Sequence, residues 1–227
     1  MKTRTQFEQD FIKFTFGTAA LYPTTTLREK INLIRFYGVS VYPGGTFLEI
    51  ALAQDRLDSY LVRARDLGFT HIEVSDGTIE LDPATRAGAI ALARAYGFGV
   101  ITEVGKKEGG SALDPDEARA QIQADLEAGA LKVIVEGRES GKNAGLLDAS
   151  GKFRTDDLER LVVGLADPGV LMWEAPLKAQ QEELIARFGP NVNLGNIPTD
   201  EVLAVEALRL GMRGDTLRLA LARMGGE

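Results

Sequence analysis

The sequence contains no cysteine and one histidine, His71. Without cysteine, disulfide bonds, thiolate catalysis and zinc sites built on cysteine are excluded. A single histidine also excludes a metal site with two protein histidines and argues against serine–histidine chemistry. His71 opens an apolar run, so we expect it to be a packed or half-exposed residue without a catalytic role.

Long apolar runs and an excess of positive charge are also absent. No run reaches the roughly 20 apolar residues that a membrane-spanning helix needs. The 26 lysines and arginines are outnumbered by 33 acidic residues, which gives a formal net charge of −7. General nucleic-acid binding would need a basic surface. We therefore expect a soluble, cytoplasmic protein that binds neither membranes nor nucleic acid, folded as one domain over residues 1–227.

Seven short apolar runs have the composition of buried parallel strands. They lie near Phe11–Phe14, Val39–Tyr42, His71–Val74, Gly99–Val104, Leu131–Glu136, Val170–Glu174 and Val192–Leu194. Stretches with helical periodicity follow them, such as Thr26–Tyr37 and Asp55–Leu67, and this alternation predicts βαβ units. An open doubly wound sheet and a barrel both fit. No Gly-rich dinucleotide turn follows the first strand, so we predict an α/β fold of the (β/α)8 TIM-barrel type, with seven βα units in this chain.

Four of these runs carry a glutamate as their last or last-but-one residue, at Glu73, Glu103, Glu136 and Glu174. Basic residues stand close behind the last three, at Lys106, Lys107, Arg138 and Lys178. The carboxyl ends of parallel strands meet at one face, so these side chains are expected to converge. One interpretation is a structural layer of ion pairs. Four repeats on one face favour the other interpretation, a site for a charged substrate.

Further residues of the sequence suit an anionic ligand. The adjacent Lys106 and Lys107 repel each other, which makes a lysine proton easier to donate near neutral pH, although a solvated loop is the alternative. Asn193, Asn196 and Arg213 fall in the last two units, where many barrels bind phosphate. Residues 137–142 resemble a nucleotide-binding loop, but the spacing is one residue short and Asn143 replaces the required Ser or Thr. Nucleotide hydrolysis is therefore rejected.

Taken together, these strings resemble the phosphosulfolactate synthase family. They cover nearly the whole chain in order: Lys13 with Gly17-Thr18, Val41–Thr46 with Glu49, Ile72–Gly77, Thr102–Lys107, Val135–Lys142, Glu174–Pro176 with Lys178 and Gln180-Gln181, Val192–Ile197, and Arg209–Thr216. The resemblance implies a (β/α)8 barrel that adds sulfite to phosphoenolpyruvate with Mg²⁺, giving 2-phospho-3-sulfolactate. That product leads to coenzyme M in methanogens and to sulfolactate in some spore-forming bacteria.

The resemblance also implies roles for individual residues. The family's proton donor falls on Lys107, with Lys106 beside it. Carboxylate oxygens suit Mg²⁺, and the expected ligands are Glu103, Glu136 and Glu174. The substrate-binding residues would be Lys13, Arg138, Lys178 and Arg213, which neutralise phosphate, carboxylate and sulfite, together with the neutral donors Asn193 and Asn196.

The chain departs from the family pattern at its start. Family members begin with a further strand that carries an Asp-Lys-Gly turn, and Thr15 stands where the family has glycine. We expect the strand with Lys13 to be covered by its own N-terminus or by a second copy, which predicts a homo-oligomer. Two other functions stay open: a relative that joins phosphoenolpyruvate or another enol to a different nucleophile, and a non-catalytic stress or assembly protein on the same scaffold, since a plant branch of the family is associated with heat tolerance. The presence of Glu103, Lys107, Arg138 and Arg213 weighs against the second.

Overall fold

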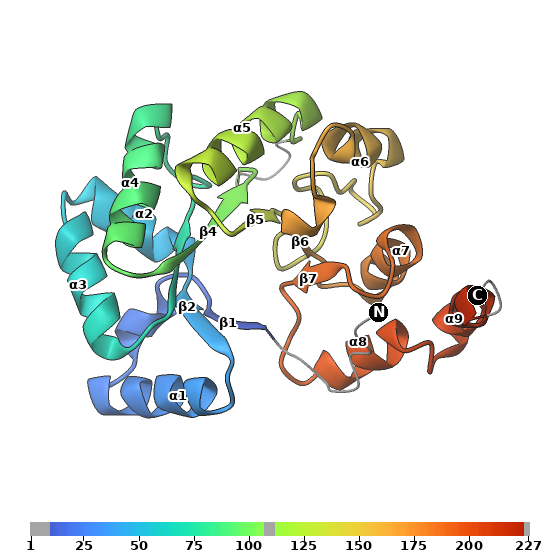
Figure 1. Cartoon of the computed structure of the whole chain (residues 1–227), viewed down its shortest axis with the longest axis horizontal. Coiled ribbons are helices and arrows are strands. Elements are labelled where there is room, and N and C mark those ends of the chain that lie inside the picture. Colours follow the sequence, from blue (N-terminus) through green and yellow to red (C-terminus); the bar gives the residue numbers. More distant parts are fainter. Residues whose placement is uncertain (1–9, 107–111, 225–227) are drawn as a thin grey trace. The chain divides into compact units, whose positions relative to one another are not determined.

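The computed structural model describes residues 10–106 and 112–224 (Figure 1). The chain divides into two compact units, and each is described by itself. Unit 1 comprises Met1–Val104 and Ala120–Val133; unit 2 comprises Gly105–Arg119 and Ile134–Glu227. The chain passes from one unit to the other after Val104, within helix α5 (Pro115–Ala128) and within strand β5 (Lys132–Val135).

Unit 1 consists of strands that alternate with helices. Its elements in chain order are β1 (Phe11–Phe14), η1 (Thr18–Leu21), α1 (Thr24–Phe36), β2 (Ser40–Pro43), α2 (Gly45–Ala53), α3 (Leu57–Leu67), β3 (His71–Val74), α4 (Pro83–Ala95) and β4 (Gly99–Val104). Strand β1 pairs in parallel with β2, and β3 pairs in parallel with β4. Helix side chains such as Ile31 and Leu61 pack against strand residues such as Val41 to form the apolar core.

Local signals explain several of the helix ends in unit 1. Helix α4 begins after Asp82, whose Oδ1 accepts hydrogen bonds from the backbone N–H of Ala84 and Thr85, both at 3.0 Å. Such a side chain satisfies the free amides of a first helical turn. Helix α3 ends at Gly68, which adopts the left-handed conformation with φ 97° that glycine accommodates without steric cost. Local sequence therefore determines where these helices begin and end.

Unit 2 continues the same alternation. Its elements are α6 (Thr155–Val162), η2 (Pro168–Val170), β6 (Leu171–Glu174), α7 (Lys178–Phe188), β7 (Asn193–Gly195), α8 (Val202–Arg209) and α9 (Gly214–Met224). Strand β6 pairs in parallel with β7. Trp173 of β6 is 2% exposed, and its ring stacks on Phe188 with centroids 5.5 Å apart. The tryptophan is therefore a core residue, which leaves it no part in ligand stacking.

The described strands correspond one by one to the seven predicted apolar runs. The predicted run Leu131–Glu136 is β5 over Lys132–Val135, and the others shift by at most a residue or two. His71 packs edge-on against the Phe11 ring, with centroids 5.1 Å apart, as a half-buried residue. Within the described residues, no helix is long and apolar enough to cross a membrane. The prediction of a single domain stays a prediction.

Candidate functional site

In unit 1, two buried glutamates face the ammonium group of Lys13. The Nζ atom of Lys13 lies 2.9 Å from Glu73 Oε2 and 3.6 Å from Glu103 Oε2. The glutamates are 0% and 1% exposed, whereas the lysine side chain is 23% exposed. The three residues form what we call the Lys13 cluster. Its lysine is the one member that solvent, or a solute anion, reaches to an appreciable extent.

Strand register brings the two glutamates to the same face. Glu73 of β3 pairs with Ile101 of β4, and Glu103 lies two residues further along β4. Residues two apart in a strand point to the same side of the sheet. Both carboxylates therefore project from one face near the carboxyl ends of neighbouring parallel strands, as the strand-end pattern predicts.

The protonation of Glu73 is shifted by its surroundings. The pKa of this carboxyl is raised to about 7 overall: burial raises it most, the Lys13 ammonium lowers it, and the Glu103 carboxylate raises it. Its Oε1 atom accepts a 2.8 Å hydrogen bond from the backbone N–H of Gly45, the first residue of α2. A Cβ atom on Gly45 would lie 2.7 Å from this oxygen, so only glycine allows the contact.

A third buried glutamate of unit 1, Glu49 of α2, holds the loop that follows β3. Its Oε1 atom accepts a 2.5 Å hydrogen bond from Ser75 Oγ, and its Oε2 atom accepts hydrogen bonds from the backbone N–H of Thr78 and Ile79 at 2.9 and 3.2 Å. The carboxylate is 1% exposed. Glu49 is therefore an organiser of this loop, because its contacts are with the protein itself.

In unit 2, the strand-end glutamates bind backbone amides. Glu136 Oε1 accepts a 2.6 Å hydrogen bond from the backbone N–H of Arg138, and Glu174 Oε2 accepts one from Gly137 at 3.1 Å. A Cβ on Gly137 would come within 2.6 Å of the Glu174 carbonyl oxygen, so this glycine permits a close approach of two backbones. The two carboxylates thus shape the turn that presents Arg138.

The same turn is tied to the loop after β7. The side-chain amide of Asn196 donates a hydrogen bond to the backbone carbonyl of Arg138 at 3.1 Å. Both residues have positive φ angles, 57° and 60°. Residues other than glycine avoid this region, and such outliers concentrate at functional sites. We call this paired turn the Arg138 clasp, because it fixes the backbone from which the guanidinium group extends.

The other predicted substrate-binding residues of unit 2 are also paired. Lys178 Nζ lies 2.7 Å from Asp215 Oδ2 and 2.8 Å from Glu182 Oε1, and Arg213 Nε lies 3.7 Å from the same Asp215 oxygen. Hydrogen bonds to Asp215 and Glu182 raise the pKa of Lys178. Asp215 therefore brings the two predicted cations together, but it and Glu182 offset much of their charge.

Asn193 occupies a different position from the one that its predicted role requires. It is the first residue of β7, and its Nδ2 donates to the carbonyl oxygens of Gly169 and Leu171 at 2.8 and 2.9 Å. These contacts lie at the starts of β6 and β7, whereas ligands of parallel sheets gather at the strand ends. The geometry gives Asn193 a structural role in joining two strands.

The predicted residues thus form three described groups. Lys13 with Glu103 belongs to unit 1; Glu136, Arg138 and Asn196 form one group in unit 2, and Lys178 with Arg213 the other. Glu174 supports the second group through Gly137. Lys106 is half-exposed just after β4, and Lys107 lies outside the described residues. The catalytic and binding roles of these residues stay predictions.

Sequence reasoning missed several organising residues. Glu49 had one usable signal, since it is the sole charged residue of the otherwise apolar helix α2. Glu73 was recognised as a strand-end acid without an assigned role. Arg86 and Asp125, which form a buried ion pair in unit 1, had no signal, because charged residues in helices usually face solvent.

No described group of three or more His, Cys, Asp or Glu residues is arranged to hold a metal ion. The predicted ligand Glu103 belongs to unit 1, and Glu136 and Glu174 belong to unit 2. Their chemistry nevertheless fits a hard divalent cation, because all three are buried carboxylates that offer oxygen donors. Binding of a divalent cation therefore remains a proposal, which is supported by the oxygen donors of these three carboxylates.

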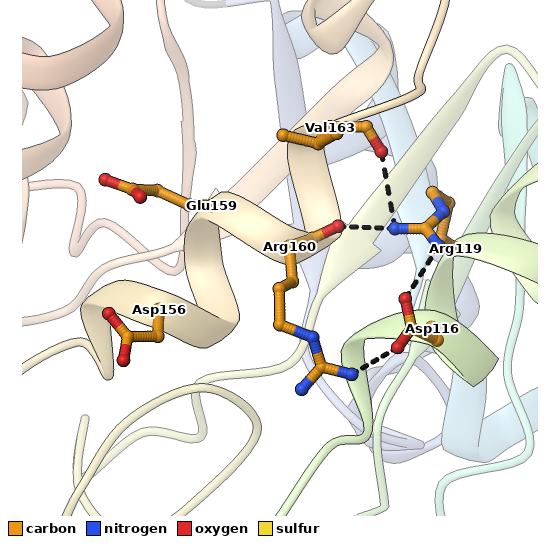
Figure 2. A pocket seen from close by; sticks show the side chains of 6 residues that line it. All are labelled: Asp116, Arg119, Asp156, Glu159, Arg160 and Val163. Carbon is orange, nitrogen blue, oxygen red and sulfur yellow. Dashed lines mark hydrogen bonds and ion pairs between the residues drawn. The ribbon is translucent and has the colours of Figure 1, made fainter.

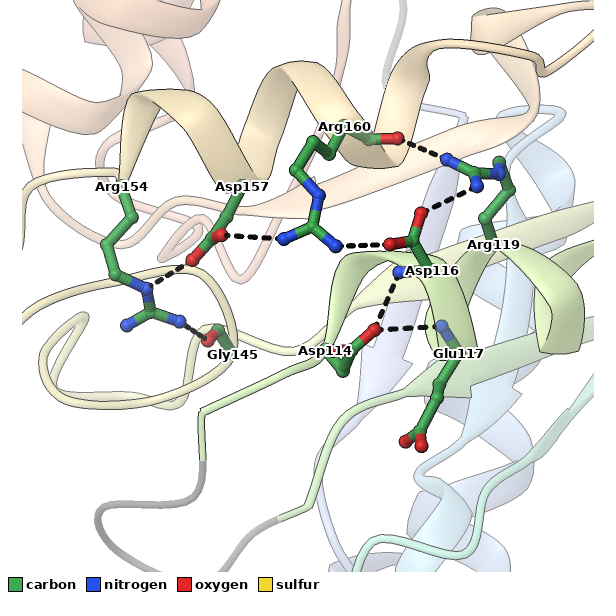
Figure 3. Close-up of polar contacts among 8 residues, drawn as sticks. All are labelled: Asp114, Asp116, Glu117, Arg119, Gly145, Arg154, Asp157 and Arg160. Carbon is green, nitrogen blue, oxygen red and sulfur yellow. Dashed lines mark hydrogen bonds and ion pairs between the residues drawn. The ribbon is translucent and has the colours of Figure 1, made fainter.

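A surface cavity of about 510 Å³ in unit 2 lies beside α6 and the first turns of α5 (Figure 2). Asp116 pairs with both Arg119 and Arg160, and Arg119 Nη1 also donates to the carbonyl oxygens of Arg160 and Val163 at 2.5 and 3.3 Å. Figure 3 extends the chain of contacts through Asp157. Arg119 and Arg160 thus bind groups of the protein itself. We interpret their contacts as structural ones that join α5 to α6 beside the cavity.

Comparison with known proteins finds a family model and curated relatives that match most of the chain. Residues 8–215 match the family model of (2R)-phospho-3-sulfolactate synthase (ComA). The chain is 45% identical over 210 residues to phosphosulfolactate synthase of Methanothermobacter thermautotrophicus, covering 92% of this chain and 81% of that protein. It is 37% identical over 212 residues to phosphosulfolactate synthase of Bacillus subtilis, covering 92% and 82%.

Two more distant similarities complete the comparison. Protein HEAT-STRESS-ASSOCIATED 32 of Arabidopsis thaliana is 25% identical over 226 residues, covering 88% of this chain and 75% of that protein. A solved structure described as a dihydrodipicolinate synthetase from Pseudomonas aeruginosa superposes with a TM-score of 0.56 at 14% identity, over 93% of this chain and 69% of that one. This last likeness concerns the fold alone, and it confirms the predicted α/β fold of the TIM-barrel type.

Proposed function

Because the chain belongs to the (2R)-phospho-3-sulfolactate synthase family, we propose that it joins sulfite to phosphoenolpyruvate and forms 2-phospho-3-sulfolactate. The observation that carries this proposal is 45% identity over 210 residues to a phosphosulfolactate synthase. The plant stress protein is similar at only 25% identity, so a non-catalytic function has weaker support. The enzyme would act as a lyase in the direction of synthesis.

The proposed reaction adds two groups across a double bond. The sulfur lone pair of sulfite attacks C3 of phosphoenolpyruvate and forms the C–S bond. The electron pair of the C2–C3 double bond moves to C2 and into the carboxylate, which becomes an aci-carboxylate. A proton then bonds to C2, so the product contains phosphoenolpyruvate, sulfite and one proton, and no group leaves.

In this proposal, lysine and arginine side chains neutralise part of the negative charge of the substrates. Lys13 is partly exposed, and Glu73 and Glu103 limit its motion while they offset part of its charge. Arg138 offers a planar fork that matches a carboxylate or phosphate group, and its backbone is held by the Arg138 clasp. Arg213 and Lys178 contribute less net charge, because Asp215 and Glu182 lie beside them.

Protonation of C2 requires an acid, for which we propose Lys107, with Lys106 as its neighbour. We further propose Mg²⁺ as cofactor, with the carboxylates of Glu103, Glu136 and Glu174 as its ligands, since hard oxygen donors suit this ion. When bound, the ion would stabilise negative charge that develops on the substrate carboxylate. The residues of the chain would bind the anions, orient them and supply the proton.

Three finer points belong to the same proposal. The nucleophile is sulfite, with a different nucleophile as the alternative that product analysis distinguishes. The protein functions in the cytoplasm, where phosphorylated three-carbon acids are metabolised. It forms a homo-oligomer, which is supported by the exposed apolar side chains Leu203, Leu210 and Met212 in unit 2; sedimentation of the purified protein measures this directly.

The decisive experiment is product analysis by mass spectrometry. The purified protein is incubated with phosphoenolpyruvate, sulfite and Mg²⁺, with chelator added in a parallel sample, and calorimetry measures phosphoenolpyruvate binding separately. A sulfonated three-carbon phosphate that requires protein and sulfite supports the proposal. Binding without this product would favour another nucleophile. A folded sample that neither binds nor turns over phosphoenolpyruvate would leave the non-catalytic function.

A further inference from the structure

A buried arginine in unit 1 makes contacts that reach the Lys13 cluster through the backbone. Arg86 of α4 is 2% exposed, and its Nε and Nη2 donate to the two carboxylate oxygens of Asp125 at 2.8 and 2.6 Å. Asp125, on α5, is 1% exposed and also accepts a 2.8 Å hydrogen bond from Gln121 Nε2. The guanidinium group is thus anchored on one side by a two-point contact of fixed orientation.

The other side of the guanidinium group points to the ends of two strands. Its Nη1 donates to Asp76 Oδ1 at 2.9 Å, two residues beyond the end of β3. Its Nη2 donates to the backbone carbonyl of Glu103 in β4, also at 2.9 Å. The Glu103 side chain is the one that lies 3.6 Å from Lys13 Nζ. The guanidinium group of Arg86 therefore connects helix α5, the loop after β3 and the backbone of Glu103, which is a member of the Lys13 cluster.

We propose that Arg86 is a positioning residue that holds the backbone of Glu103, and thereby sets the place of the Glu103 carboxylate relative to Lys13 and Glu73. This inference goes beyond the proposed function, because it assigns a role to Arg86, a buried residue outside the proposed substrate-binding set. Only the part of its test that measures turnover rests on the proposed function.

The chemistry of the contact requires arginine. A lysine ammonium is a point charge that cannot present parallel donors to both Asp125 oxygens and, in the same plane, a donor to the Glu103 carbonyl. Packing alone does not require the pair, because apolar side chains of similar volume often replace a buried ion pair without loss of stability. Stability and positioning can therefore be separated by experiment.

The test compares four proteins: the wild type, Arg86→Lys, the double variant Arg86→Met/Asp125→Leu, and Gln121→Leu. The double variant removes Arg86 and Asp125 together, so neither charge of the buried pair stays buried without the other; Asp76, which also loses a contact with Arg86, is 23% exposed. Gln121→Leu removes a hydrogen bond to Asp125 while leaving the contact with Glu103. Thermal unfolding, kcat and KM for sulfite addition, and the rate of amine labelling at Lys13 followed by mass spectrometry are measured for each.

We expect the folded double variant and Arg86→Lys to lose about 10- to 100-fold in kcat, because small misplacements of catalytic groups have effects of this size. KM should change less, Lys13 should label several-fold faster, and Gln121→Leu should match the wild type in both. Wild-type kcat and wild-type Lys13 labelling in a folded double variant would overturn the inference. An inactive wild type would reject the proposed function instead, and the labelling comparison alone would then decide the role of Arg86.

Discussion

The side-chain amide of Asn196 holds the backbone carbonyl of Arg138 at 3.1 Å, and both residues adopt left-handed backbone conformations. Two residues with unfavourable φ angles are thus stabilised by a direct contact with each other. Because Glu136 Oε1 also binds the Arg138 N–H, both backbone polar groups of this arginine are engaged. The arrangement presents the guanidinium group from a backbone with little freedom.

Replacing Asn196 tests the Arg138 clasp. Asn196→Ala removes the hydrogen bond and places a residue in the left-handed region that tolerates it less well than asparagine does, with a combined cost of about 1–3 kcal/mol. Asn196→Gly removes the same hydrogen bond without backbone strain. We expect both variants to raise the KM for phosphoenolpyruvate, and Asn196→Ala alone to lower the melting temperature clearly. Unchanged KM in both variants would show that the clasp does not serve substrate binding.

The proposed role of Lys107 as the acid is tested by comparing its replacement with the same replacement of Lys106. If Lys107 protonates C2, Lys107→Met should lower kcat by roughly 10²- to 10⁴-fold, the usual range for a positioned proton donor. Lys106→Met is the matched control, since it removes the same charge one residue earlier, and its effect should be smaller and partly on KM. Steady-state kinetics with both variants decides the point. Equal kcat in Lys107→Met and the wild type would remove this lysine from the mechanism.

Glu73 predicts a pH dependence of stability with a definite sign. Its pKa is raised from the ordinary value of 4.5 to about 7 in the folded protein, chiefly by burial. Between these values the folded state keeps a proton that the unfolded chain has released. The contribution of Glu73 to stability is therefore present at pH values below about 4.5 and is lost as the pH rises through about 7.

The variant Glu73→Gln should remove this contribution. We expect its melting temperature to fall less than that of the wild type between about pH 4.5 and about pH 7, the range in which folded and unfolded wild type bind different numbers of protons at Glu73. Glu29→Gln, a change of an exposed carboxyl on α1, should preserve the wild-type slope. Thermal unfolding at a series of pH values, with chelator present, measures the slopes. Parallel curves for all three proteins would contradict the assigned shift.

Two glycines allow a matched test of close packing. In Gly45→Ala the new Cβ would lie 2.7 Å from Glu73 Oε1, so we expect overpacking to cost about 1–3 kcal/mol and to disturb the Lys13 cluster. Nothing lies within 4 Å of a Cβ built on Gly88 in α4. Gly88→Ala should therefore stabilise the protein by roughly 0.5–1 kcal/mol. Denaturant titration compares the two; a tolerated Gly45→Ala would mean that α2 can move away from β3.

Much of the fold follows from local patterns. The seven strands of the described residues lie within a few residues of their predicted positions, because each is a short β-branched or aromatic run next to a turn residue. Helix α3 ends at Gly68 as its sequence predicts. The helix α2 was not predicted as a separate element. Its sequence is apolar at nearly every position, and a pattern without a polar face carries no helical period.

The sequence by itself determined the family, the order of strands and helices, and the placing of acids and bases at strand ends, because these depend on residues close together in the chain. Only the tertiary structure decided which charges meet. Lys13 lies between Glu73 and Glu103, Arg86 is buried against Asp125, and Lys178 is neutralised by Asp215. Such pairs join residues far apart in sequence. The residues next to a charged side chain in the sequence do not indicate whether it will contact a buried partner or solvent.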